Sequence, residues 1–83
     1  MTYFVYLIGS YRKSKVTTYA GYTNNLKNRL MLHNTGRGAK FTKVRIWKLL
    51  YCEKFKTKKE AISREIYIKK NRKFRNLIKE KFA

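Results

Sequence analysis

The sequence predicts one domain over residues 1–83, of the α/β class in its α+β form. It would hold a three-stranded antiparallel sheet and three helices in the order β-β-α-β-α-α. Three runs of aromatic and β-branched residues have the composition of strands. Helix-capping residues precede three further segments in which apolar residues recur at helical spacing. A chain of 83 residues has room for a single core, so a second domain is not expected.

The first two strands are expected to form an antiparallel hairpin. Tyr3–Ile8 is apolar or aromatic throughout, which is typical of a buried strand. Val16–Gly21 is the second run, and the basic segment Tyr11–Lys15 between them is expected to turn the chain. Tyr6 and Tyr19 would then lie in neighbouring strands and could face each other across the hairpin.

A third strand is expected at Arg45–Phe55, after the basic loop Gly36–Lys43. Side chains alternate between the two faces of a regular strand. Alternation would place Trp47, Leu49 and Tyr51 on one face and Ile46, Leu50 and Cys52 on the other.

The three helices are expected from their caps and apolar positions. The first follows the polar residues 23–25 and carries a stripe of Leu26, Leu30 and His33. The second begins with a capping box made by Thr57 and Glu60 and runs to about residue 70. Asn71 would cap the third, whose apolar positions are Phe74, Leu77, Ile78 and Phe82.

The composition excludes several kinds of catalytic site. The chain has 22 Lys or Arg, four Glu, no Asp, one His and one Cys, and its net charge is +18. A zinc site of Cys and His ligands, a Ser-His-Asp triad and a carboxylate-walled two-metal site all need more such residues. The positive charge favours a polyanionic partner, nucleic acid first and an acidic membrane surface second.

Targeting features are also lacking in the sequence. The longest apolar run is far shorter than the roughly 20 residues that span a bilayer, and it has no secretory cleavage site. The single Cys52 cannot form a disulfide within the chain, which fits a reducing compartment. We therefore expect a cytoplasmic protein that does not enter a membrane.

One carboxylate stands out by its place on the second predicted helix. Glu65 falls on the apolar side of this helix, between Ala61 and Ile68. A carboxylate there costs free energy unless it is paired or bound to a cation. An ion pair with one of the many Lys and Arg residues and a metal ion both satisfy this requirement.

The first predicted helix carries a pair of possible phosphate ligands. Arg29 and His33 are four residues apart and so share one surface. A guanidinium can clamp phosphate oxygens while an imidazole moves one proton. The alternative is a histidine at the edge of the core beside a solvated arginine.

Tyrosines and further basic residues complete the candidates. Seven tyrosines either pack the strand faces or, in a dense positive field, acquire a lowered pKa that suits them to accept a proton. The basic side chains nearest the predicted turn and loop are candidates for nucleic-acid binding, with aromatic residues between them that could stack on bases. These basic residues are Lys13, Lys15, Arg37, Lys40 and Lys43.

Four motifs in this order resemble the GIY-YIG nuclease domain. Val5-Tyr6 and Tyr19-Ala20-Gly21 are similar to the two motifs that name the family. Residues 22–34 are similar to its first helix, and residues 61–69 to the helix that carries its metal-binding Glu. The resemblance covers essentially the whole chain and is closest to the small, stand-alone bacterial branch of the superfamily.

The resemblance implies a role for each candidate residue. Tyr6 and Tyr19 would lie at the active site, where one of them takes a proton from the attacking water. Arg29 would stabilise the charge that grows on the phosphate, and His33 would assist proton transfer or position the nucleophile. Glu65 would bind one divalent ion, Mg²⁺ or Mn²⁺, mainly when substrate is present. The Asn that many family members carry after this Glu would correspond to Asn76.

We therefore expect a metal-dependent endonuclease that hydrolyses DNA phosphodiester bonds by a one-metal mechanism. The alternative is a basic DNA- or RNA-binding module that keeps the fold without the catalysis. DNA is preferred to RNA as the partner, and the form of the nucleic acid and the oligomeric state stay open. The joint presence of Tyr6, Tyr19, Arg29, His33 and Glu65 favours the enzyme, since a binding module has no need of the complete set.

Overall fold

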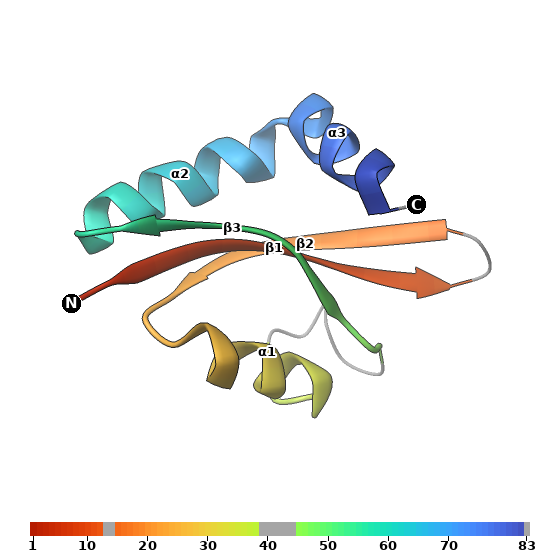
Figure 1. The fold of residues 1–83 in the computed structure, drawn as a ribbon, viewed down its shortest axis with the longest axis horizontal. Helices are drawn as coiled ribbons and strands as arrows, with labels where there is room; N and C mark the ends of the chain where they lie inside the picture. The colour runs from red at the N-terminus through yellow and green to blue at the C-terminus, as the bar shows by residue number, and fades with distance from the viewer. Residues whose placement is uncertain (13–14, 39–44, 83) are drawn as a thin grey trace.

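The computed structural model describes residues 1–12, 15–38 and 45–82, and it confirms the predicted element order (Figure 1). The strands are β1 (Tyr3–Arg12), β2 (Lys15–Thr23) and β3 (Lys48–Phe55). The helices are α1 (Leu26–Asn34), α2 (Lys58–Lys70) and α3 (Arg72–Phe82).

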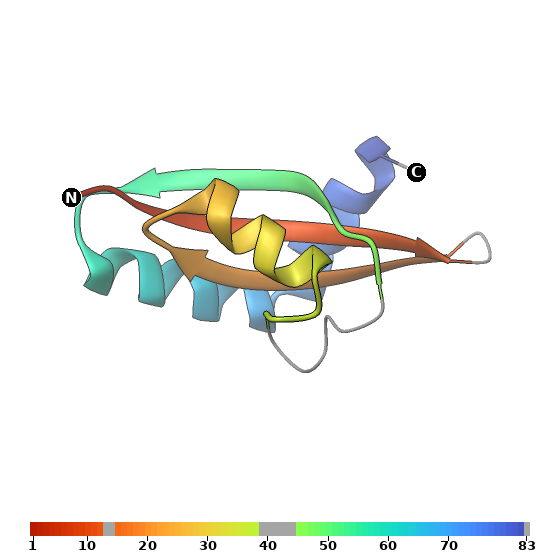
Figure 2. The same ribbon diagram turned by 90° about the horizontal axis from the view of Figure 1, so that it is seen from below.

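The three strands form one antiparallel sheet in the order β2-β1-β3, so β1 is central and β2 is an edge strand. Helix α1 crosses one face of the sheet, and Figure 2 shows it in front of the strands, with β1 between the other two. Helices α2 and α3 cover the opposite face (Figure 1). The sheet therefore has a helical layer on each side.

The central strand β1 supplies both layers of the core. Val5 and Leu7 are fully buried with the apolar side chains of α2 and α3, including Ala61 and Ile68. The alternate residues of β1 pack on the other face with Trp47 and the apolar stripe of α1. Because both faces of β1 are covered, its sequence is a continuous apolar run instead of an alternating one.

The hairpin is longer than the sequence predicts. β1 and β2 stay paired as far as Arg12 and Lys15, so the expected polar turn at Tyr11–Lys15 was wrong for the residues at its ends. An antiparallel ladder is made by backbone groups, so exposed basic side chains can continue it beyond the apolar core. Tyr11 is accordingly 45% exposed although it lies in a strand.

The third strand departs from the predicted alternation. Leu7 pairs with Tyr51 and Ile8 with Leu49, so Leu50 is an extra residue in β3. Trp47 packs on the α1 side of the sheet, whereas Leu50 and Tyr51 pack on the other side. The expectation that Trp47, Leu49 and Tyr51 share a face was wrong because a bulge shifts the alternation by one residue.

The strand also begins later than predicted, at Lys48. The backbone N–H of Trp47 donates to Oδ1 of Asn34 at 2.6 Å, and Nδ2 of Asn34 donates to the carbonyl of Trp47 at 3.2 Å. The side chain of Asn34, at the end of α1, thus makes the hydrogen bonds to the Trp47 backbone that a neighbouring strand would otherwise make. This contact fixes α1 against the segment that enters β3.

The predicted helix caps are confirmed. The side chain of Asn25 accepts from the N–H of Asn28 and begins α1, and Thr57 accepts from the N–H of Glu60 and begins α2. Asn71 accepts from the N–H of Phe74 at 2.9 Å at the start of α3. Each cap satisfies an N–H group that the first turn of a helix leaves without a partner.

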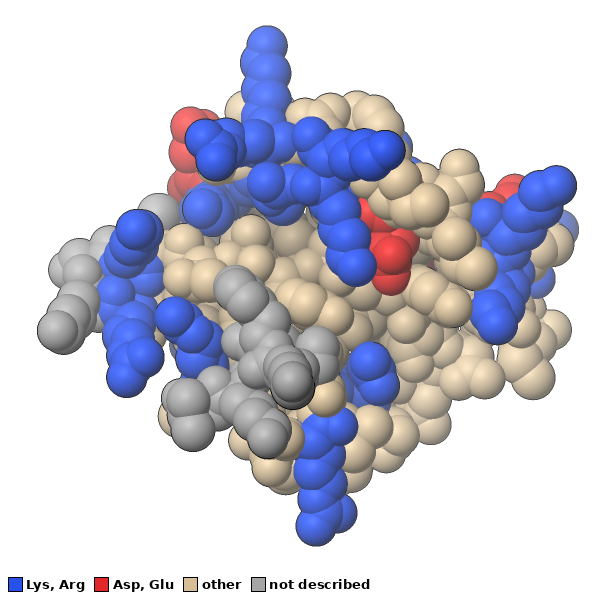
Figure 3. All heavy atoms as spheres, turned by 180° about the vertical axis from the view of Figure 1, so that it is seen from behind, with Lys and Arg blue, Asp and Glu red and all other residues tan. Residues whose placement is uncertain are grey.

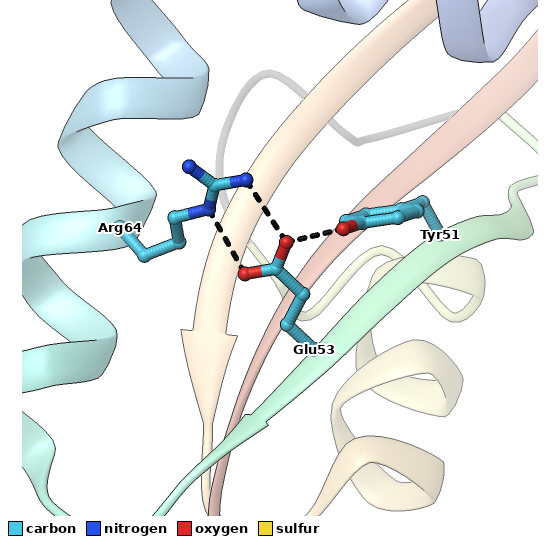
Figure 4. A network of polar contacts seen from close by, with 3 residues as sticks. All are labelled: Tyr51, Glu53 and Arg64. Atoms are coloured by element: carbon cyan, nitrogen blue, oxygen red, sulfur yellow. Dashed lines mark hydrogen bonds and ion pairs between the residues drawn. The ribbon is translucent and has the colours of Figure 1, made fainter.

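One ion pair joins β3 to α2 (Figure 4). Nε and Nη2 of Arg64 donate to the two carboxylate oxygens of Glu53 at 2.9 and 3.0 Å, and the hydroxyl of Tyr51 also donates to this carboxylate. The Arg64 guanidinium lies over the rings of Tyr67 and Phe74, at 4.6 and 5.3 Å from their centroids. The network therefore ties the sheet to both helices of this layer.

This network predicts a stability change in acid. Burial alone would raise the pKa of Glu53, but the hydrogen bonds from Arg64 and Tyr51 and the charge of Arg64 together hold it below its usual value. The stabilisation is therefore present above the pKa of an unfolded glutamate, near about 4.3, and is lost as the pH falls through the lower folded value.

We expect Glu53→Gln to lower the free energy of unfolding by about 1 kcal/mol at neutral pH, since the pair is partly exposed. Urea unfolding from about pH 7 to about pH 3 should show the difference from wild type shrinking in acid. Glu80→Gln, at an exposed position of α3, is the matched control and should change little. A difference that stays constant across this range would contradict the assignment.

Candidate active site

Tyr6 is one of the two fully buried candidate residues, together with His33. It lies in the middle of β1 on the α1 side of the sheet and is 1% exposed. Its partner across the hairpin is Gly21, and a Cβ atom at position 21 would overlap the Tyr6 hydroxyl. Glycine at this position therefore lets the phenol lie flat across β2, so that the hydroxyl reaches the far side of that strand.

Tyr19 lies on the same face, two residues before the partner of Tyr6. The residue directly opposite Tyr19 is Ile8, so the two tyrosines are diagonal neighbours and do not face each other directly. The prediction that Tyr6 and Tyr19 face each other was wrong, because Tyr6 pairs with Gly21, two residues after Tyr19. Diagonal neighbours on one face still lie within reach of long aromatic side chains.

His33 joins the two tyrosines from α1. It is fully buried, and its Nε2 lies 2.8 Å from the hydroxyl oxygen of Tyr6. Its ring centroid is 5.7 Å from that of Tyr6 and 5.2 Å from that of Tyr19. A Cβ atom at Gly38 would overlap Nδ1, so the chain after α1 closes over the other edge of the imidazole.

Burial sets the protonation states of this pair. Burial raises the pKa of Tyr6, and the nearby Arg29 lowers it by less than burial raises it. The expectation of a lowered tyrosine pKa was therefore wrong for Tyr6, because removal from water outweighs the positive field. Burial, and next the charge of Arg29, lower the pKa of His33. At neutral pH the hydrogen bond thus joins a phenol to an uncharged imidazole.

Arg29 projects from α1 toward the tyrosines, one turn before His33. It is partly buried, and its Nε is shielded from solvent without a hydrogen-bond partner among the described residues. Such a donor normally has a partner in a folded protein. Arg29 also lines the pocket, and a guanidinium binds phosphate oxygens well.

Glu65 reaches the same place from α2. Its side chain is 15% exposed, and its Oε1 lies 3.4 Å from Nζ of Lys69, one turn later on the helix. The ion pair with Lys69 is one of the two ways in which this carboxylate could be stabilised, and its position at the pocket also allows the other, a metal ion. The described residues contain no group of three or more His, Cys or Glu that could hold a metal. A cation at Glu65 would therefore take its other ligands from water and substrate, which suits Mg²⁺.

These side chains line one open pocket of about 440 Å³. Four of the five predicted catalytic and metal residues lie on its wall, and His33 lies behind Tyr6 instead. The lining also includes residues that the sequence analysis did not select, at the open end of the hairpin and at the start of α2. The complete lining is Tyr3, Tyr6, Tyr19, Gly21, Tyr22, Thr23, Asn24, Arg29, Lys58 and Glu65.

Other predicted residues lie elsewhere. Lys15 and Arg37 are exposed and do not line this pocket, and Asn76 lines a different groove. Lys13, Lys40 and Lys43 lie outside the described residues. Lys58 could not be selected from the sequence, because only the packing of α2 on β2 brings it to the pocket. Tyr22 could have been selected from the sequence, because it directly follows the Tyr19–Gly21 motif.

Two strand tyrosines, an arginine of α1 and a glutamate of α2 thus line one pocket. Residues 2–79 match the model of the GIY-YIG catalytic domain, and the chain belongs to this family.

Its relatives include small bacterial proteins. A UPF0213 protein of Bacillus licheniformis is 57% identical over 53 residues, which cover 63% of this chain and 55% of the relative. The UPF0213 protein YazA of Bacillus subtilis is 55% identical over 53 residues, covering 63% and 54%. A UPF0213 protein of Oceanobacillus iheyensis is 42% identical over 76 residues, covering 90% and 85%. The matched part spans about half of the first two relatives, and no solved structure matches the chain significantly.

The described part of the chain has no helix that is long and apolar enough to cross a membrane.

The geometry predicts how the only histidine titrates. The imidazole signals of His33 can be followed by NMR without ambiguity, because the chain has one His. We expect its pKa to lie below the usual value of about 6.5. Arg29→Gln should raise this pKa only part of the way, since it removes the like charge but not the burial, which is the larger cause.

Arg37→Gln, an exposed position just after α1, is the matched control and should leave the titration unchanged. Because the unfolded chain binds the proton more readily, this histidine should also lower stability as the pH falls below about 6.5. A pKa at or above that value would contradict the buried, neutral imidazole.

Proposed function

We propose that this chain is an endonuclease that hydrolyses DNA phosphodiester bonds with the help of one divalent metal ion. The observation that carries the proposal is the convergence of Tyr6, Tyr19, Arg29 and Glu65 on one pocket, from two strands and two helices. Only four carboxylates exist in the chain, so the use of one of them at this place is selective. The fold alone would not require a polar pocket there.

The tyrosine and histidine would handle the proton of the attacking water. The uncharged His33 can take the proton of the Tyr6 hydroxyl through Nε2 when Nδ1 carries the ring proton. The Tyr6 oxygen then takes a proton from the water, so charge does not accumulate on the phenol. This relay avoids a free phenolate, which the raised pKa of Tyr6 makes scarce, and the lowered pKa of His33 favours return of the proton afterwards. Tyr19, on the same face, would position the water.

Arg29 would stabilise the phosphate as negative charge grows on it. Arg29 lines the pocket, where its guanidinium can donate to a non-bridging oxygen. A preorganised cation beside the phosphate interacts strongly with this charge. Its position beside Tyr6 would place the phosphate next to the residue that activates the water.

Glu65 would hold the metal, Mg²⁺ or Mn²⁺, which when bound supplies Lewis-acid stabilisation to the phosphate and the leaving oxygen. The positive charge of the chain and the ion pair with Lys69 both oppose a cation at Glu65 in the free protein. DNA phosphates would offset this repulsion and add ligands. We therefore expect Glu65 to bind the metal mainly when substrate is present.

A second candidate function is a DNA- or RNA-binding module without catalysis. It is favoured by the ion pair of Glu65 with Lys69, which satisfies the carboxylate without a metal. The two functions differ in one measurement, the Mg²⁺-dependent cleavage of labelled single-stranded, duplex, flap and branched DNA. Binding without cleavage of any substrate would select the module.

Glu65→Gln should abolish Mg²⁺-dependent cleavage, because an amide is a poor ligand for a hard cation. The substitution preserves volume, so folding should be retained, and DNA binding should be equal or tighter since a repulsive charge is removed. Glu80→Gln makes the same change at an exposed position away from the pocket and should cleave as wild type does. Full cleavage by the Glu65 variant in a nuclease-free preparation would remove Glu65 from the mechanism.

Arg29→Ala should reduce turnover by about 10²-fold or more, as the loss of a group that stabilises the transition state does. The fold should survive, because Arg29 flanks the apolar stripe of α1 and is only partly buried. Single-turnover cleavage gives the rate, and thermal unfolding gives the stability. A strongly destabilised variant would favour a structural role, and an unchanged rate would refute the assigned one.

A further inference from the structure

A second and larger groove lies beside the catalytic pocket. Its volume is about 730 Å³, and it runs between the edge strand β2 and the helices α2 and α3. The floor is made by residues 15–20 of β2. The helical wall is made by Lys69, Arg72, Arg75, Asn76 and Lys79.

Five of the residues that line this groove are cations, and none of the four glutamates of the chain lines it. Figure 3, which shows the molecule from behind, has Lys and Arg side chains gathered over the helices above a hollow of uncharged surface. Cations brought this close repel one another, and a polyanion in the groove would relieve the repulsion. Lys15 faces the helical cations from the β2 side.

The helical cations are arranged by the register of α3. Arg72, Arg75, Asn76 and Lys79 recur at the spacing of one helical face, so they point into the groove together. The Arg75 guanidinium donates to the carbonyls of Ile68 and Lys69 at the end of α2. This contact holds α3 against α2 and leaves Arg72 and Lys79 as the groove cations that the described hydrogen bonds do not use.

The groove adjoins the catalytic pocket. Tyr19 lines both. Lys69 lines the groove, while its Nζ lies 3.4 Å from the Glu65 carboxylate and 5.8 Å from the Tyr19 ring centroid. A strand that leaves the pocket past Tyr19 would therefore enter the row of cations directly.

We propose that this groove binds the phosphate backbone of the DNA that flanks the phosphate in the catalytic pocket. That the bound DNA flanks a phosphate under attack rests on the proposed nuclease function, whereas the binding of DNA by the groove does not. Thr18, which lies on the same face of β2 as Ala20, can donate a hydrogen bond to a phosphate oxygen, as hydroxyl side chains commonly do. The contacts reach the backbone, so they predict affinity and position without a preference for base sequence.

The test compares two double variants of α3 with equal charge. Arg72→Glu with Lys79→Glu removes two groove cations, and Lys73→Glu with Lys81→Glu makes the same change of charge at exposed neighbours that do not line the groove. The paired positions lie in the same first and last turns of the helix, so effects on its dipole are matched. Binding is measured by fluorescence anisotropy without divalent metal, on duplex DNA of about 20 base pairs, which exceeds the 38 Å length of the protein.

We expect the groove variant to bind at least about tenfold more weakly than the control variant at low salt, because two phosphate contacts are lost. The slope of log K against log salt should become shallower by about 2, whereas the control should keep the slope of wild type. Equal weakening by both variants would show that only net charge matters and would overturn the proposal. Unchanged binding by both would do the same, and would leave the groove to another occupant, such as an added peptide strand on β2.

Thermal unfolding checks that both variants are folded. If a charge-reversed variant unfolds, the same comparison can be made with smaller changes of charge. The groove variant is then Arg72→Gln with Lys79→Gln, and the control variant is Lys73→Gln with Lys81→Gln. These measurements do not involve cleavage. Loss of binding in the groove variant together with full cleavage by Glu65→Gln would therefore reject the proposed mechanism while keeping the groove. Intact binding by the groove variant, together with abolished cleavage by Glu65→Gln, would reject the groove while keeping the proposed mechanism.

Discussion

The hydrogen bond between Tyr6 and His33 is the contact on which the geometry of the pocket depends. It is buried where β1, β2 and α1 meet, and it needs Gly21 beneath the phenol and Gly38 against the imidazole. Burial keeps both partners uncharged at neutral pH. A polar pair is costly to bury unless each group has a partner, so this bond also fixes how α1 lies on the sheet.

The second constraint is electrostatic. A chain with a net charge of +18 and four glutamates can neutralise only a few of its cations internally. Glu53 neutralises Arg64 and supports the fold, while Glu65 pairs with Lys69 at the junction of pocket and groove. The other cations that line the groove have no ion pair with a glutamate among the described residues. These two ion pairs thus leave most of the cations of the chain without a carboxylate partner among the described residues.

The sequence predicted the element order, the caps and the residues that converge on the pocket, because these depend on local patterns and short motifs. It did not predict the face assignment of β3, since the bulge at Leu50 is set by pairing with β1 and leaves no mark in the alternation. The raised pKa of Tyr6 was also missed, because burial depends on α1 packing over β1. The groove between β2 and the helices was missed because it joins residues about 50 or more positions apart.

The burial of β1 between two helical layers has a mechanical consequence. Val5 and Leu7 anchor one layer and Tyr6 the other, so neither layer can shift without disturbing the strand that they share. Close-packed interiors resist such shifts. The walls of the pocket are therefore stiff, and under the proposed function the adjustment needed to seat a phosphate would fall on the DNA. Steps, ends and unpaired stretches that bend at little cost would then be accommodated most readily, whatever their bases.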